Sequence, residues 1–398
     1  MKTSLLFAGI ARTVRTARLS MIASAIAMTG AIAIAVAGAP RVAHAQASGF
    51  AVNRFEPSER GSEWFANESL DMRSLDLHGA LRPAVGAVFD WAYKPLLVFP
   101  ADNLQAPAHA NVITDQIFLH VGTALVVGER FRFGVSLPIA IYQNGDELEA
   151  IAIAARAPSK AAVGDTRLSG DALLYGNYGS VLRVAVGTQV FLPTGSRTQF
   201  TGDGTVRVAP RFLLAGDYLG FVYAGKVGFA FRPFDDTFEG RPLGSEVLFS
   251  AAVGVKVNDR FVFGPEVYGS TVVTGDRPLR TRDTPLEMLI GARLSLGDDA
   301  QVGTAIGPGL TRGDGTPSMR VVISIEYAPH ACVDKDGDGI CDNDDACPLV
   351  DGLRTNDPKT NGCPPQGDPH VGVSPTSPAP PASVSPPPGS TPPTPKPE

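Results

Sequence analysis

Hydrophobic and polar residues alternate along most of the chain between residues 82 and 327. The segment from Arg130 to Gly145 shows the pattern most clearly. An apolar residue stands at every second position from Phe131 to Ile141, and small or polar residues up to Tyr142 share the other parity. Successive side chains of a strand point to opposite faces, so this pattern predicts one apolar and one polar face. A strand of about ten residues can cross a bilayer at a tilt.

The pattern recurs about twelve times and predicts strands near residues 83–98, 111–126, 130–143, 164–177, 181–194, 204–216, 219–233, 244–257, 260–273, 284–297, 301–313 and 317–328. Short turns, such as Gly128-Glu129 and Gly216-Asp217, alternate with long polar loops, such as 144–163 and 274–283. Short periplasmic turns and long external loops are typical of bacterial outer-membrane barrels.

The predicted fold is therefore an all-β, antiparallel, up-and-down transmembrane β-barrel of about twelve strands over residues 80–329. In lipid the sheet must close, because open edges would leave backbone groups without partners in hydrocarbon. An even strand count places the C-terminus in the periplasm of a Gram-negative bacterium. The alternative, a soluble β-sandwich, needs shorter strands and a polar outer surface.

On the barrel interpretation the polar parity lines the lumen, because charges are too costly on a lipid face. Two functions follow from such a lining. A wet, slightly basic lumen passes small solutes in the manner of a porin and favours anions. Alternatively, the charges pair across the lumen and close it, which leaves a structural envelope anchor or adhesin without transport. The charged lumen-lining candidates are Arg132, Arg167, Asp171, Arg183, Arg207, Arg211, Lys226, Glu246, Lys256, Glu266, Glu287, Arg293 and Arg320.

Three further segments flank the barrel. Residues 1–45 combine a basic start, an apolar run and the cleavage pattern Ala43-His44-Ala45, which predicts a cleaved signal peptide. The alternative is a transmembrane anchor, for which this run, mostly Ala and Gly, is weakly hydrophobic. Residues 46–79 are polar and mixed; we expect a periplasmic extension there, either under or inside the barrel mouth or without any chemical role. Residues 367–398 are rich in Pro, Ser and Thr, which predicts a disordered, extended tail. Contact of this tail with the cell wall is one alternative, and a truncated relative of a longer protein is the other.

An acidic segment, residues 330–366, follows the barrel. Asp334, Asp336 and Asp338 take positions 1, 3 and 5 of a calcium loop, with Gly339 at the sharp turn. Carboxylates at alternate positions around a glycine provide the oxygen ligands that Ca²⁺ prefers. The alternative is an acidic linker that binds no ion. The predicted metal ligands are Asp334, Asp336, Asp338, the carbonyl of Ile340, Asp342 and Asp345.

All four cysteines lie in this acidic segment. An even, clustered set implies two disulfides or a metal site, and the export signal permits disulfides. The carboxylate-rich context and wide spacing disfavour zinc. We pair Cys332 with Cys341, which would close the calcium loop, and Cys347 with Cys363.

The residues from Asp334 to Pro348 resemble a thrombospondin type 3 repeat, D-x-D-x-D-G-x-x-D-x-x-D-x-C-P. Its position after a barrel, with this four-cysteine spacing, is similar to the linker of OmpA/OprF-type outer-membrane proteins. The resemblance implies a barrel, a calcium-binding disulfide hinge and then a peptidoglycan-binding domain. The Pro-rich tail stands in place of that domain, so wall binding by such a domain does not carry over.

The net charge and the positions of the histidines bear on which classes of function the sequence favours. The formal net charge of −6 gives no reason to expect nucleic acid as a partner. His120 is the histidine in a predicted strand interior, and the pattern places no Ser or Asp to join it in a catalytic group. The sequence therefore predicts a non-enzymatic membrane protein whose partners are outer-membrane lipid and small solutes.

Overall fold

The computed structural model describes residues 49–73, 81–98, 110–146, 161–233, 236–238, 241–257, 260–274, 280–297, 299–329, 336–338, 340–342 and 344–365. The chain divides into two compact units, residues 1–334 and 335–398. The expected signal peptide and the Pro-rich tail lie outside the described residues.

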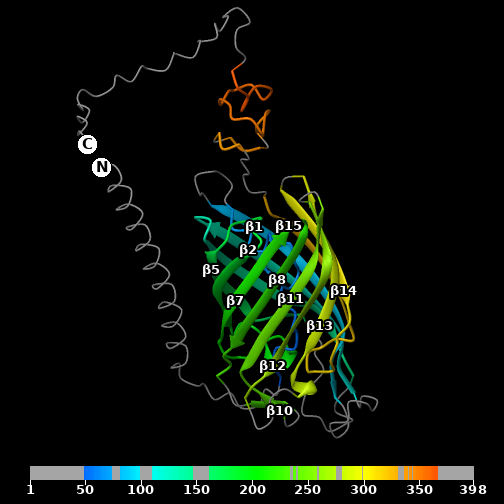
Figure 1. The fold of residues 1–398 in the computed structure, drawn as a ribbon. Helices are drawn as coiled ribbons and strands as arrows, with labels where there is room; N and C mark the ends of the chain where they lie inside the picture. Colours follow the sequence, from blue (N-terminus) through cyan, green and yellow to red (C-terminus); the bar gives the residue numbers. More distant parts are fainter. Residues whose placement is uncertain are drawn as a thin grey trace, which may run out of the picture. The chain divides into compact units, whose positions relative to one another are not determined.

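The first unit is a closed antiparallel β-barrel of twelve long strands, which confirms the predicted fold class (Figure 1). Each strand pairs with its neighbour along the chain, and β1 pairs with β15 to close the sheet, with Val85 opposite Tyr327. The long strands are β1 (Arg82–Val98), β2 (Ala110–Val127), β3 (Phe131–Asn144), β5 (Thr166–Tyr175), β6 (Arg183–Leu192), β7 (Arg207–Tyr218), β8 (Phe221–Ala230), β11 (Glu246–Val257), β12 (Phe261–Val272), β13 (Leu286–Leu296), β14 (Ala300–Gly307) and β15 (Met319–Tyr327).

Short strands and 3-10 helices lie at one end of the barrel, which we call the loop end because the long connections between strands are there. The opposite end, with the short connections, is the turn end. The short strand β4 pairs with β3 just ahead of β5, and β9 and β10 form a separate hairpin. The short elements are β4 (Ala162–Val163), η3 (Arg197–Gln199), β9 (Asp236–Phe238), β10 (Arg241–Leu243) and η4 (Thr281–Asp283).

The turn between β7 and β8 differs from the sequence prediction. It consists of Leu219 and Gly220, both with positive φ, rather than Gly216-Asp217. Gly216 instead lies inside β7, where an added Cβ would clash with the carbonyl of Val181 and the ring of Tyr223. The glycine is needed for this close approach, and the sequence pattern alone does not distinguish that role from a turn.

A β-bulge alters the parity of β3. The register with β2 shifts between Ile117 and Phe118, so that Ile141 is an extra residue in β3. Beyond a bulge the side chains change face. Tyr142 is therefore 48 % exposed on the outer face, although the alternation pattern placed it with the polar parity.

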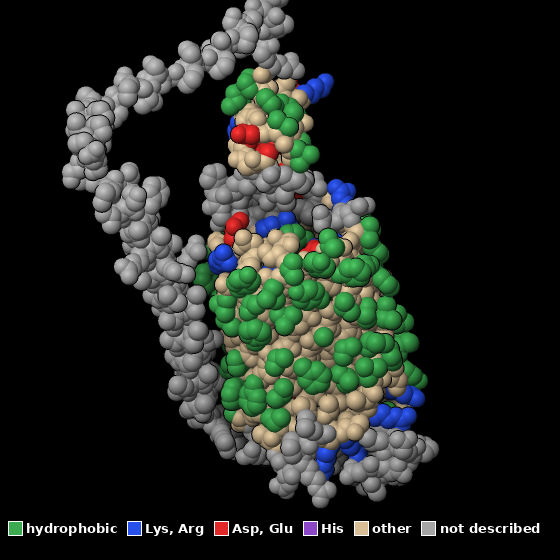
Figure 2. Space-filling view, in the orientation of Figure 1, with side chains coloured by type: hydrophobic (Ala, Val, Ile, Leu, Met, Phe, Trp, Pro, Cys, Tyr) green, Lys and Arg blue, Asp and Glu red, His purple; other side chains and the backbone are tan. Residues whose placement is uncertain are grey.

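The outer face of the barrel is apolar. Large hydrophobic side chains on the outward parity are exposed, and Figure 2 shows them spread over the visible wall, with most charged groups near the ends. Soluble proteins rarely expose so continuous an apolar surface, whereas a barrel wall in lipid requires one. Within the described ranges no helix is long and apolar enough to cross a membrane.

Replacing Ile323 on this outer face by arginine should destabilise the barrel by about 2–4 kcal/mol, the usual cost of a cation near the bilayer midplane. Ile323 lies at the middle of β15 and its side chain is 55 % exposed. Tyr327→Arg, at the strand end on the same face, should cost less because the cation reaches the interface. Urea unfolding in lipid vesicles measures both, with Ile323→Leu as the control. Equal tolerance of both arginines would contradict a lipid-facing wall.

Candidate functional site

The interior of the barrel carries the charged residues that the alternation pattern assigned to the lumen. All of them lie on the inward parity of their strands, and all but Lys226 are buried. The buried members are Arg132, Arg167, Asp171, Arg183, Arg207, Arg211, Glu246, Lys256, Glu266, Glu287, Arg293 and Arg320. Because a buried charge needs a partner, the question is what lies opposite them.

Residues 49–73, which we call the lumen segment, run through the barrel from one end to the other. At the loop end, Phe50 and Val52 pack among side chains that include Leu96 and Phe200. At the turn end, Leu70 and its neighbours pack among Val126, Leu173, Val222 and Val262. The periplasmic extension expected for residues 46–79 is described over residues 49–73, and that part lies inside the barrel, as one of the two alternatives for this segment has it. The physical reason is charge complementarity between the segment and the wall.

A basic cluster on β3, β5 and β7 binds the acidic side chains of the lumen segment. Arg132 lies 2.9 Å from the Glu68 carboxylate, and Arg167 lies 3.3 Å from that of Glu59. Arg211 lies 3.8 Å from both carboxylates. The wall's own Asp171 accepts hydrogen bonds from Arg132 and from Arg211, the latter at 2.9 and 2.8 Å. Three guanidinium groups and three carboxylates therefore balance on this side of the lumen.

An acidic cluster on β11 and β12 holds the opposite side of the segment. Glu246 accepts hydrogen bonds from Arg54 at 3.0 Å and from Arg232 at 2.9 Å. Glu266 accepts hydrogen bonds from the backbone N–H groups of Phe65 at 2.7 Å and Ala66 at 2.9 Å. It also accepts one from the Asn67 amide at 3.0 Å. A single wall carboxylate thus binds three consecutive residues of the lumen segment, 65–67.

Arg320 of β15 is the most enclosed cation in the described barrel interior, with no exposed surface. Its guanidinium donates two hydrogen bonds to Glu287, at 2.8 and 3.2 Å, and another to Asp90. It also donates one to Asn53 of the lumen segment at 3.1 Å. A planar fork of donors suits this arrangement, because it binds one carboxylate in a bidentate manner and still reaches others.

His120 has a partner that the sequence pattern did not identify. Its Nε2 lies 2.7 Å from the Asp90 carboxylate, on the adjacent strand. Asp90 also accepts hydrogen bonds from Arg320 and, at 2.9 Å, from Asn53. The pair therefore belongs to the network that holds the lumen segment.

Tyr178, in the β5–β6 turn, contacts several charged side chains at the turn end. Its hydroxyl accepts a hydrogen bond from Lys256 at 2.6 Å and donates one to Glu63 at 3.1 Å. Burial and the Glu63 carboxylate raise the pKa of Tyr178 to about 12, so the hydroxyl keeps its proton. Its ring lies 3.5 Å from the Arg73 guanidinium and 5.2 Å from that of Arg183.

Asp71 fixes the end of the lumen segment beside the start of β1. Burial by itself raises the pKa of this carboxyl, but Arg82 and Arg73 together hold it far below its usual value. Arg82 donates to the carboxylate at 2.9 Å and to the Asp71 carbonyl at 2.6 Å. The carboxylate is therefore ionised at any physiological pH, and the attachment does not depend on pH there.

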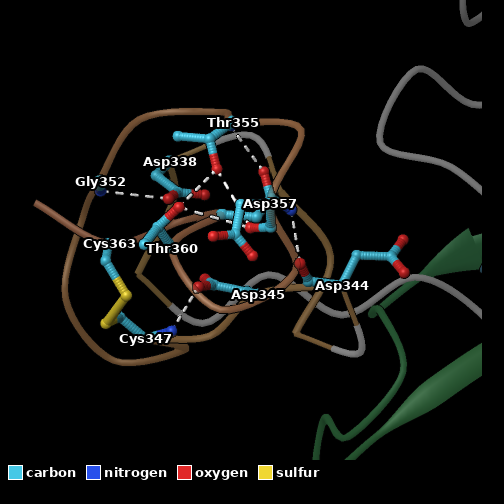
Figure 3. Close-up of a disulfide and its surroundings, with 10 residues drawn as sticks. Asp338, Asp344, Asp345, Cys347, Gly352, Thr355, Asp357, Thr360 and Cys363 are labelled. Atoms are coloured by element: carbon cyan, nitrogen blue, oxygen red, sulfur yellow. Dashed lines mark hydrogen bonds between the residues drawn. A yellow bond between two sulfur atoms is a disulfide. The ribbon is translucent and has the colours of Figure 1, made fainter.

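The second unit contains the acidic motif. Carboxylate oxygens of Asp336, Asp338 and Asp345 lie within 4.8 Å of one another, and the side chain of Ile340 is buried. Asp345 accepts a hydrogen bond from the Cys347 N–H through one oxygen (Figure 3). Its other oxygen is buried and has no hydrogen-bond partner in the described residues. This donor set fits a hard cation. Asp342 is outside the three-carboxylate group, and Asp334 lies outside the described residues.

A disulfide between Cys347 and Cys363 is present, as the sequence pairing predicts (Figure 3). Cys341 is disulfide-bonded as well, and its expected partner, Cys332, lies outside the described residues. The bridge draws the start of the loop 347–363 against its end, where Leu353 and Cys363 also form a short β-bridge. Asp338 is linked to the same loop, because it accepts a hydrogen bond from the Gly352 N–H at 3.1 Å.

Comparisons with known proteins find no family for this chain. No family model and no curated protein sequence matches it. Among solved structures the chain is similar to the NanC porin, at 8 % identity and a TM-score of 0.38 over 62 % of this chain and 99 % of that one. It is also similar to LpxR from Salmonella typhimurium, at 12 % identity and a TM-score of 0.35 over 61 % and 99 %. The barrel assignment rests on the strand pairing of this chain itself.

Proposed function

We propose that this chain is an outer-membrane β-barrel of a Gram-negative bacterium whose lumen is closed by its own N-terminal segment. The observation that carries the proposal is that residues 49–73 pass through the whole barrel and make ion pairs with both sides of the wall. The apolar outer face supports a membrane location. The protein then serves as an envelope anchor, and contact between its Pro-rich segment and the cell wall is part of this proposal.

Porin-like passage of small solutes is a second candidate function. The charged and polar inner face of the wall favours it, because such a lining suits the passage of small hydrophilic solutes. Single-channel recording in a planar bilayer separates the two candidates. The closed-anchor proposal expects no current steps from a well-folded sample of the full chain, because a continuous segment with paired charges fills the lumen. Stable steps of uniform size would favour passage instead.

We also propose that the acidic unit binds Ca²⁺, which the convergent carboxylates of Asp336, Asp338 and Asp345 support. Ca²⁺ modules outside cells typically bind with a Kd of about 10⁻⁴–10⁻³ M, and we expect a value in or somewhat tighter than that range. Asp345→Ala should weaken binding by about tenfold or more, because it removes a buried ligand oxygen.

Calorimetric titration of the full chain with Ca²⁺ measures this affinity. Asp351→Ala is the matched control, because Asp351 is an exposed carboxylate of the same unit outside the three-carboxylate group. The control should keep the affinity of the unmodified chain. Absence of any saturable heat at millimolar Ca²⁺ would show that the acidic spacing is only a solvated linker.

A further inference from the structure

A cavity remains between the lumen segment and the barrel wall. The segment lines it mainly with residues from Ala51 to Pro57, and the wall lines it with residues of β2, β3, β5, β6, β7, β8, β11 and β12. Aromatic side chains, among them Phe191 and Tyr268, contribute apolar surface. Its volume of about 100 Å³ exceeds what a single water occupies, so it can hold a small molecule.

Most of the charges that face this cavity are already balanced. Arg54 pairs with Glu246 at 3.0 Å, and Arg167 pairs with Glu59 at 3.3 Å. Arg207 lies 2.8 Å from the Asp203 carboxylate and 3.6 Å from that of Asp165. These three guanidinium groups have carboxylates of the protein as partners, and an additional ligand is not needed to balance them.

Lys226 and Glu56 are the exceptions. Lys226 projects from β8 on the wall, and Glu56 belongs to the lumen segment; both line the cavity. Neither makes an ion pair or a hydrogen bond within the part of the chain that the structure describes. The two opposite charges therefore face a common space without direct contact.

We infer that this cavity binds a small zwitterion of the α-amino-acid type, with its carboxylate on Lys226 and its ammonium group on Glu56. A molecule that carries both charges a few ångströms apart bridges the two unpaired groups and leaves no net charge in the lumen. The aromatic lining accommodates a small apolar substituent. The inference rests on the lumen being occupied by residues 49–73, and is independent of whether the barrel conducts ions.

Calorimetric titration of the full chain in detergent micelles tests the inference, with glycine as the zwitterionic probe. Acetate and methylammonium are the single-charge probes, because each carries one of the two groups of glycine. We expect saturable heat with glycine and binding at least about tenfold weaker with either single-charge probe. Lys226→Met and Glu56→Gln should each weaken glycine binding by about tenfold or more.

Folding of these variants should be unaffected, because neither side chain has a direct partner to lose; heat-modifiable mobility on gels checks this. Lys226→Arg keeps the charge and should keep glycine binding. Lys359→Met, a lysine of the second unit, is the matched control and should bind as the unmodified chain does. Absence of saturable heat from glycine in a folded sample would overturn the inference, as would unchanged binding in Lys226→Met. Equal affinity for acetate would overturn it in favour of a simple anion site.

Discussion

Deleting residues 49–73 should convert a non-conducting barrel into an ion channel. These residues fill the lumen, whereas the wall keeps its own closed ladder of backbone hydrogen bonds when they are removed. The wall charges that the segment balances would then face water. Basic groups on β3, β5 and β7 would lie across the lumen from acidic groups on β11 and β12. Charged side chains that face each other across a water-filled lumen make its interior polar, and a polar interior lets ions pass.

Planar-bilayer recording measures this change. The full chain should give no steps above the bare bilayer, and the deletion variant should give stable steps. Deletion of residues 367–398, a somewhat longer stretch outside the barrel strands, is the control and should leave the barrel without current steps. A deletion variant that folds and stays silent would show that the lumen segment is not what closes the barrel.

Replacing Arg320 by methionine should cause the largest loss of stability among single substitutions in the lumen, about 3–5 kcal/mol. The substitution removes the shared donor of Asp90 and Glu287 and leaves two carboxylates buried without their cation. The cost comes mainly from these unpaired charges rather than from lost packing.

Urea unfolding of the reconstituted barrel measures the free energy. Ile323→Met, on the outer face of the same strand, is the control and should cost less than about 1.5 kcal/mol. Adding Asp90→Asn and Glu287→Gln to Arg320→Met should recover part of the loss, because it neutralises both carboxylates. A loss for Arg320→Met no larger than that of the control would contradict the ion-pair network.

The strands could be predicted from the sequence because the alternation that marks each strand lies within the strand itself. Alternation at period two directly reflects which side chains face lipid, so eleven strands were predicted to within three residues of their observed bounds. The strand predicted over 301–313 is shorter, because β14 ends at Gly307. Two further errors in the strand prediction fall at positions where the same local pattern can arise from two different structures. Gly216 serves close approach rather than a turn, and the bulge at Ile141 reverses the parity of Tyr142.

The sequence did not predict which segment fills the lumen, for a different reason. The alternation placed Arg132, Arg211 and Glu266 on the inner face, but it carries no information on what lies opposite. Glu59 and Arg211, or Phe65 and Glu266, are far apart in the chain, and their contact depends on the closed barrel. The sequence does carry one signal, the density of charges and aromatic residues between Glu59 and Asp71, which is unusual for a linker.

A disulfide placed between the lumen segment and the wall tests the closed lumen most directly. The side-chain oxygens of Asn67 and Ser250 lie 2.6 Å apart, one on the segment and the other on β11. The double variant Asn67→Cys, Ser250→Cys, expressed and exported as the full chain, should form this bridge. Mass spectrometry should then recover a linked peptide pair that contains both positions, from a barrel with normal heat-modifiable mobility. A folded barrel in which both new thiols stay free and react with maleimide would contradict a lumen closed by residues 49–73.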